Sequence, residues 1–262
     1  MGIVQGKTVI VSGVGPGVGR EIAASIVRDG GNAVIGARKA ERLAAIGEAL
    51  DPSGEHVAVC PTDILDADAC ARLVETAEQR FGAVDAVVHV AALDYVMGGI
   101  DDTSDADWEA TLTTNVLGTM RLTKAAVPAL RRAGGGSIVF IGSQQFAKPA
   151  VAVPQLAYGT SKGALFSAAL NLAQQLGRDH IRVNTVVPTY MWGPNVEGYF
   201  TSAAEQHGIT VEQATAPMRA NMPLGEIPLD EDVAEAVTFF CSDRSRMITG
   251  QTLFVNAGEL FW

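Results

Sequence analysis

Short runs of apolar, often β-branched residues recur along the chain and alternate with longer segments in which apolar residues return every three or four positions. The short runs predict β-strands, and the longer segments predict amphipathic helices. The predicted strands lie at residues 7–12, 32–37, 55–60, 84–91, 136–142, 180–187 and 252–255. The predicted helices lie at residues 17–29, 40–50, 67–81, about 105–132, 157–178 and 230–242.

The strand patterns indicate how these elements are arranged. Runs such as KTVIVS and NAVIGA are apolar at successive positions, which is typical of a parallel sheet covered on both sides. Strands that alternate with helices further predict right-handed crossovers. We therefore expect one α/β domain over residues 1–262, a Rossmann-type doubly wound fold with a seven-stranded parallel sheet flanked by helices on both faces.

A glycine-rich turn joins the first predicted strand to the first predicted helix, in the sequence SGVGPGVG. Gly13 permits a tight turn, Gly17 lets the backbone approach a pyrophosphate, and Gly19 lets the helix pack closely on its strand. The helix N-terminus adds unpaired N–H groups and the positive end of its dipole. The pattern predicts a dinucleotide site, with a plain turn as the alternative.

Tyr158 and Lys162 lie four residues apart in a segment with helical spacing, so both side chains fall on one face. A neighbouring ammonium favours the phenolate and lowers the pKa of a tyrosine from its ordinary value of about 10. The pair therefore predicts proton exchange with an alcohol or ketone. An exposed helical contact is the alternative.

Composition limits the kinds of partner and location. A formal charge of −10 disfavours nucleic acid and anionic membranes, which are bound through clustered Lys and Arg. We see no N-terminal signal and no apolar run long enough for a membrane span, so we expect a cytoplasmic protein. The three cysteines are widely spaced without a CxxC pair, so we expect neither disulfides nor a metal site.

Further motifs appear as TNVLG around Asn115, IGSQQ around Ser143 and YGTSK from Tyr158 to Lys162. With the glycine turn, they resemble the TGxxxGxG loop and Asn-Ser-Tyr-Lys tetrad of the short-chain dehydrogenase/reductase family, with Ser12 where Thr is usual. The resemblance runs nearly from end to end. It implies hydride transfer between a nicotinamide cofactor and a secondary alcohol or ketone, and a homotetramer.

The resemblance also implies a role for each tetrad residue. Tyr158 exchanges the proton, and Ser143 hydrogen-bonds the substrate oxygen where charge develops. Lys162 lowers the pKa of the tyrosine and holds the nicotinamide ribose, while Asn115 anchors a water that links Lys162 to solvent. From the residues alone, Asn115 could instead be a polar residue that kinks a helix, and Ser143 could be a strand-end cap.

The end of the second predicted strand decides the cofactor. An acidic residue there would bind the ribose of NAD, but the sequence has Ala37 followed by Arg38, which can pair with a 2′-phosphate. NADP(H) is favoured, and NAD(H) remains possible if Arg38 stacks on the adenine. Asp63 resembles the family's adenine-contacting Asp, with a helix N-cap as the alternative. The residues expected to bind the cofactor are Ser12, Gly13, Gly15, Gly17, Val18, Gly19, Arg38, Asp63, Ile64, Ala91, Ala92, Tyr158, Lys162, Pro188, Thr189 and Met191.

The chain departs from the family where NNAG is usual. It has His89, Val90, Ala91 and Ala92, so His89 either replaces an asparagine as a donor or is a buried histidine.

Substrate information comes from residues 189–228, which read as a long irregular lid rich in Met and aromatic residues. Such residues suit a bulky apolar substrate, or they only seal the lid onto the core. The pocket walls expected from residues after the catalytic strands are Tyr95, Gln144, Gln145, Leu156 and Trp192. A 3-oxoacyl thioester reductase is the alternative function, and a non-catalytic dinucleotide sensor is a remote one.

The chain ends in Phe261 and Trp262. An exposed pair of large rings would lower solubility, so we expect both to be buried, at a subunit interface or against a substrate pocket.

Overall fold

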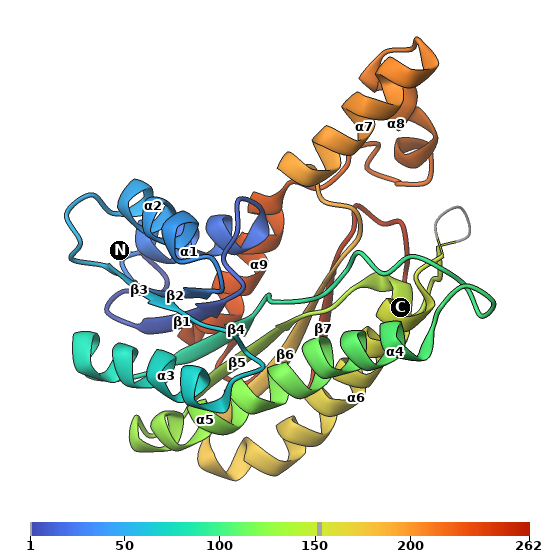
Figure 1. Cartoon of the computed structure of the whole chain (residues 1–262). Helices are drawn as coiled ribbons and strands as arrows, with labels where there is room; N and C mark the ends of the chain where they lie inside the picture. The colour runs from blue at the N-terminus through green and yellow to red at the C-terminus, as the bar shows by residue number, and fades with distance from the viewer. Residues whose placement is uncertain (1, 151–153) are drawn as a thin grey trace.

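A seven-stranded parallel sheet forms the centre of the protein (Figure 1). The computed structural model describes residues 2–150 and 154–262. The strands run in the order β3-β2-β1-β4-β5-β6-β7, and every neighbouring pair is parallel. Their bounds are β1 Thr8–Ser12, β2 Asn32–Ala37, β3 Val57–Pro61, β4 Ala86–His89, β5 Gly136–Ile141, β6 Ile181–Pro188 and β7 Thr252–Val255. The predicted fold class is confirmed.

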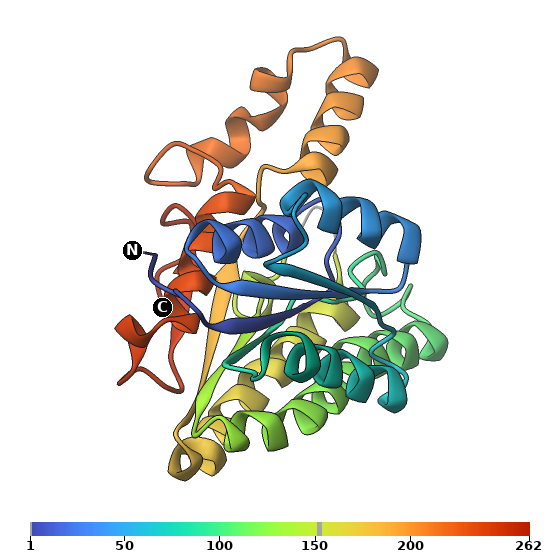
Figure 2. The same ribbon diagram turned by 90° about the vertical axis from the view of Figure 1, so that its left-hand side faces the viewer.

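Helices cover both faces of the sheet (Figure 2). Helices α1 and α9 pack together on one face, and α3, α5 and α6 cover the other. The bounds are α1 Val18–Arg28, α2 Ala40–Leu50, α3 Ala67–Phe81, α4 Asp105–Leu112, α5 Thr119–Arg132, α6 Leu156–Leu176, α7 Pro194–His207, α8 Val211–Ala220 and α9 Asp230–Cys241. None of the helices described is long and apolar enough to cross a membrane.

The alternation of side chains along β1 shows why the strands read as continuous apolar runs. Val9 and Val11 belong to the buried cluster under α1 and α9, whereas Ile10 belongs to the cluster under α3, α5 and α6. All three side chains are fully buried. Since successive side chains of a strand point to opposite faces, each position must be apolar when both faces are covered.

The segment predicted as one α-helix at about 105–132 is interrupted near its middle. A π-helical turn, η1 (Thr113–Gly118), separates α4 from α5 and contains Asn115. A π-turn inserts an extra residue into the helix, which periodicity in the sequence does not reveal.

The segment at 189–228 is also more regular than predicted. It contains helices α7 and α8, which project from the body of the protein beyond the carboxyl ends of the strands (Figure 1). Pro194 occupies the first turn of α7, and Thr210 and Gln213 form a capping box at α8. Both features are helix-start signals, so the prediction of an irregular segment was wrong.

The C-terminal segment crosses back toward the end of β5. Glu259 accepts hydrogen bonds from Gln144 Nε2 at 2.8 Å and from Lys148 Nζ at 3.0 Å. The Trp262 ring lies 5.4 Å from the Phe146 ring, yet Phe261 and Trp262 are 82% and 75% exposed. Within a single chain the two terminal rings are exposed, so their burial at a subunit interface or against a substrate pocket stays a prediction.

Candidate active site

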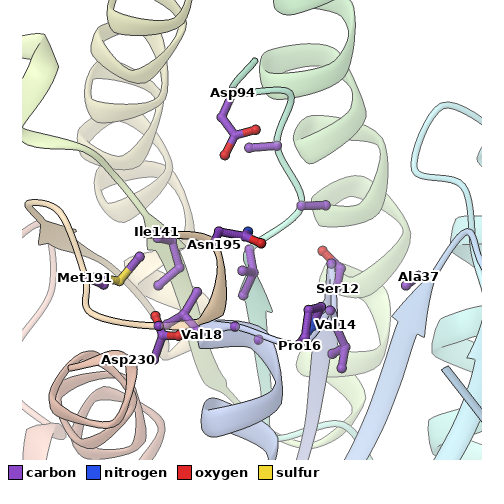
Figure 3. A pocket seen from close by; sticks show the side chains of 18 of the residues that line it. Ser12, Val14, Pro16, Val18, Ala37, Asp94, Ile141, Met191, Asn195 and Asp230 are labelled. Carbon is purple, nitrogen blue, oxygen red and sulfur yellow. The ribbon is translucent and has the colours of Figure 1, made fainter. Parts of the chain in front are cut away.

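A cavity of about 470 Å³ opens beyond the carboxyl ends of β1, β4, β5 and β6 (Figure 3). The strand order changes direction here, because β1 pairs with β2 on one side and with β4 on the other. Ligands of doubly wound sheets bind at such a switch point. Every residue expected to bind the cofactor lines this one cavity, and so does Ser143.

The glycine turn leaves its backbone open to a ligand. Gly13 has φ +91°, and a Cβ there would lie 2.2 Å from Ala91 N. Gly17 caps α1 without any side-chain hydrogen bond, so first-turn N–H groups remain available. Ser12 Oγ is buried, and it has no hydrogen-bond partner among the residues that the structure describes. Free donors and an unpartnered hydroxyl around a helix N-terminus fit an anionic group such as a pyrophosphate.

Basic side chains surround the end of β2. Arg38 and Lys39 are exposed and line the cavity, as does Arg42 in the first turn of α2. None of the three forms an ion pair within residues 2–150 and 154–262. Arg42 was not predicted, although it follows Arg38 by four residues. The three cations suit a phosphate at this end of the cavity.

Asp63 lines the cavity near the same end of the sheet. Its Oδ1 accepts a hydrogen bond from Leu65 N at 2.9 Å. The N-cap of α3 is Asp66, so Asp63 is not the cap of that helix.

Tyr158 and Lys162 project from α6 toward the end of β5. Lys162 Nζ donates to Ile141 O at 2.7 Å and lies 5.5 Å from the centroid of the Tyr158 ring. Ser143, two residues beyond Ile141, lines the same cavity as Tyr158 and Lys162, and its hydroxyl acts on the pKa of Tyr158. The spacing in the sequence therefore brings these three side chains together.

The direction of the Tyr158 pKa differs from the prediction. Burial raises the pKa of Tyr158 above its ordinary value, the hydrogen bond to Ser143 opposes this, and Asp94 adds to it. Burial lowers the pKa of Lys162 to about 8, against the opposite effect of Asp94. The expectation of a lowered tyrosine pKa was wrong for this structure, because desolvation of the phenolate outweighs the effects that favour it.

Asn115 stands behind the cavity rather than in it, and it is fully buried. Its Oδ1 accepts from Leu93 N at 2.6 Å, and its Nδ2 donates to Leu93 O at 3.0 Å and to Ser161 Oγ at 2.9 Å. The side chain thus fastens the segment after β4 to α6. Its predicted water relay stays a prediction.

His89 is buried at the end of β4. Its Nε2 lies 3.1 Å from Thr123 Oγ1, whereas Nδ1 has no partner among the described residues. Burial lowers the pKa of His89 to about 3, so the ring is neutral at physiological pH. It does not line the cavity, whereas Ala91 and Ala92 do.

The five predicted substrate walls lie outside the cavity. Tyr95 is 71% exposed, Leu156 is 37% exposed, and Trp192 stacks on Phe200 at 6.2 Å. Gln145 Nε2 hydrogen-bonds Gln155 Oε1 instead.

Gln144 joins two loops at the rim of the cavity. Its Nε2 donates to Thr189 Oγ1 at 2.9 Å and to Glu259 Oε2.

Many residues that line the cavity were not predicted. Among the polar ones, besides Arg42, are Asp94, Thr114, Asn195 and Asp230. Asp94 lies in the segment after β4, Asn195 lies in the first turn of α7, and Asp230 begins α9. Nothing in the local sequence marks them, because only the fold brings these segments to the glycine turn.

Comparisons with known proteins extend over nearly the whole chain. The family model described as enoyl-(acyl carrier protein) reductase matches residues 13–259. Bovine (Bos taurus) dehydrogenase/reductase SDR family member 4 is 31% identical over 255 residues, which cover 97% of this chain and 87% of that protein.

Solved structures agree with this relationship. A short-chain type dehydrogenase/reductase from Mycobacterium ulcerans is 30% identical with a TM-score of 0.87, covering 99% of this chain and 91% of the other. L-sorbose reductase from Gluconobacter frateurii, in complex with NADPH and L-sorbose, is 25% identical with a TM-score of 0.91, covering 99% and 98%.

Proposed function

The chain belongs to the short-chain dehydrogenase/reductase family, and from that premise we propose that it interconverts a secondary alcohol and a ketone with a nicotinamide cofactor. One observation carries the proposal. The glycine turn and the side chains of Ser143, Tyr158 and Lys162 line the same cavity. A dinucleotide whose pyrophosphate meets the turn at Gly17 would extend along this cavity toward Tyr158.

A nicotinamide cofactor held in this cavity would supply or accept the hydride. In reduction, the Tyr158 hydroxyl would donate its proton to the carbonyl oxygen and be left as a phenolate, and in oxidation Tyr158 would act in the phenolate form and take up the proton of the alcohol. Its raised pKa keeps Tyr158 in the neutral, proton-donating form at pH 7. Ser143 would donate a hydrogen bond to the oxygen, and Lys162 would hold the ribose hydroxyls beside Tyr158.

NADP(H) is the proposed cofactor, because Arg38, Lys39 and Arg42 are free of described ion pairs where a 2′-phosphate would lie. The solved relative with NADPH supports the same choice. Equilibrium titration should show tighter binding of NADPH than of NADH. Arg38→Ala should weaken NADPH roughly tenfold or more and leave NADH nearly unchanged. Arg72→Ala, which removes an arginine outside the cavity, is the control. Equal affinity of the wild type for both cofactors would favour NAD(H) instead.

The substrate class is the finer part of the proposal. A bulky apolar alcohol or ketone requires α7 and α8 to close over the cavity, since the aromatic residues of the lid lie outside it. A 3-oxoacyl thioester is the second candidate. The description of the matching family model names a different acyl-carrier substrate, an enoyl thioester. Initial rates with apolar secondary alcohols, L-sorbose and a 3-oxoacyl thioester separate the candidates. Turnover of the thioester or the sugar alone would refute the apolar proposal.

We also propose a homotetramer. Leu117 of η1 and Leu170 of α6 are 51% and 43% exposed, which leaves apolar surface for a second copy. Isologous contacts close into dihedral assemblies. Light scattering at micromolar concentration should give four times the chain mass, and a monomer would refute this.

A further inference from the structure

Asp230 places a carboxylate inside the proposed pyrophosphate cradle (Figure 3). It is the first residue of α9 and is 5% exposed. A Cβ added to Gly17 would lie 3.3 Å from its Oδ2, and a Cβ added to Gly193 would lie 2.0 Å from the same atom. The carboxylate thus fills the space between the glycine turn and the loop after β6.

No hydrogen bond or ion pair reaches this carboxylate from residues 2–150 or 154–262. Helix α1 faces it with Glu21 and Arg20, which are paired with each other. Its own helix adds Glu231 and Asp232, and Asp232 Oδ2 accepts from Leu229 N at 2.8 Å. The loop after β6 contributes Tyr190 as its titratable group. The positive dipole ends at the N-termini of α1 and α9 therefore stabilise negative charge at this place.

A pyrophosphate bound at the N-terminus of α1 would bring two negative charges into the same field. In a poorly solvated site, repulsion between the Asp230 carboxylate and the pyrophosphate weakens binding of the dinucleotide. Proton uptake by the carboxyl group removes this repulsion. A protonated carboxyl also becomes a hydrogen-bond donor to a phosphate oxygen.

We propose that Asp230 sets the affinity of the cofactor site, because its carboxyl group takes up a proton when a dinucleotide binds. This inference rests on the proposed function, which places the pyrophosphate at the glycine turn. The carboxylate form opposes binding, and the protonated form accommodates it.

The direction of the titration gives the pH window. Burial, with smaller effects of Glu231 and Glu21, raises the pKa of Asp230 to about 6 in the free protein. Phosphate charges raise it further, so proton uptake begins above about pH 6. Affinity should fall roughly tenfold per pH unit above that pH, until the pKa of the bound form is reached. Below about pH 6, this group should cause no further change.

The test measures binding of ADP-ribose by calorimetry between pH 5.5 and 9 at constant ionic strength. ADP-ribose carries the pyrophosphate but lacks the nicotinamide and the titratable 2′-phosphate. Wild type should lose about ten- to a hundredfold in affinity over two pH units, with close to one proton taken up per ligand. Asp230→Asn should show a flat profile and bind more tightly than wild type at pH 8. Glu231→Gln, a carboxylate on the same helix turn that does not line the cavity, should keep the slope of the wild type.

Two results would overturn the proposal in different ways. If ADP-ribose affinity depends on pH equally steeply in wild type and Asp230→Asn, Asp230 has no role in cofactor binding. The proposed function would then remain intact. Absence of binding of ADP-ribose, NADH and NADPH to the wild type at every pH would overturn the proposed function, and this inference with it. If Asp230→Asn does not fold, the wild type alone still tests the proposal. The number of protons taken up on binding of ADP-ribose is then measured in buffers of different ionisation enthalpy. No uptake refutes the proposal.

Discussion

Replacing Gly13 by alanine tests the packing of the glycine turn separately from its role in binding. The new Cβ would lie 2.2 Å from Ala91 N, far inside van der Waals contact. That N–H donates to Ser12 O at 3.0 Å and joins the ends of β1 and β4. The residue would also have to keep φ at +91°. Alanine therefore introduces backbone strain, an overlap and a stretched hydrogen bond at one point.

The expected loss follows from these terms. A left-handed non-glycine residue costs about 1–2 kcal/mol, overpacking about 1–3 kcal/mol, and the hydrogen bond about 0.5–1.5 kcal/mol. Gly13→Ala should lower the free energy of unfolding by roughly 3 to 6 kcal/mol. With a urea dependence of about 3 kcal/mol per molar, the unfolding midpoint should fall by about 1 to 2 M.

Gly15→Ala is the matched control in the same turn. No atom lies within 4 Å of its added Cβ, so stability should change by less than about 0.5 kcal/mol. Because Gly15 lines the cavity, dinucleotide affinity should nevertheless fall. Urea midpoints are compared at one protein concentration, since the stability of an oligomer depends on it. Equal midpoints for the Gly13→Ala and Gly15→Ala proteins would refute the steric argument.

Three other predictions concern catalysis, pH and the tail. Tyr158→Phe should bind cofactor normally but lose about 10²- to 10⁴-fold in kcat, and near-normal turnover would exclude Tyr158 as the proton donor. Burial lowers the pKa of His89 from 6.5 to about 3 in the folded protein. Below pH 6.5 the unfolded chain therefore binds a proton that the folded protein does not, and the folded state loses stability. The free energy of unfolding of the wild type relative to His89→Gln should therefore fall by up to about 1.4 kcal/mol per pH unit between pH 6.5 and 5, and parallel curves would contradict a buried neutral ring. Deletion of residues 260–262 should raise KM for a bulky substrate and spare a small ketone, whereas equal losses with dissociation would indicate a role in assembly alone.

Local patterns in the sequence were enough to predict the frame of the site. A four-residue spacing on a helix places Tyr158 and Lys162 on one face, and Ser143 follows the end of a buried strand. These relations need only the geometry of single elements. The pKa of Tyr158 could not be predicted in this way, because desolvation depends on everything that packs around the phenol.

Other features depend on contacts between distant segments. Asp230 meets Gly17 only because α9 packs beside α1, so no window of sequence containing one residue contains the other. The helices α7 and α8 are a different case. Their start signals at Pro194 and Thr210 were present, but the Met and aromatic residues of the segment 189–228 suggested a loose lid.

The strand order has a consequence for how the protein is made. During synthesis β1 emerges first, but its second neighbour, β4, begins only at Ala86. Until then one edge of the central strand lacks its partner. The proposed pyrophosphate cradle is completed later still, when Asp230 and α9 leave the ribosome and pack against α1. A dinucleotide bound at that cradle would therefore not template the early steps of folding on the ribosome, and it would stabilise only a chain that is almost finished.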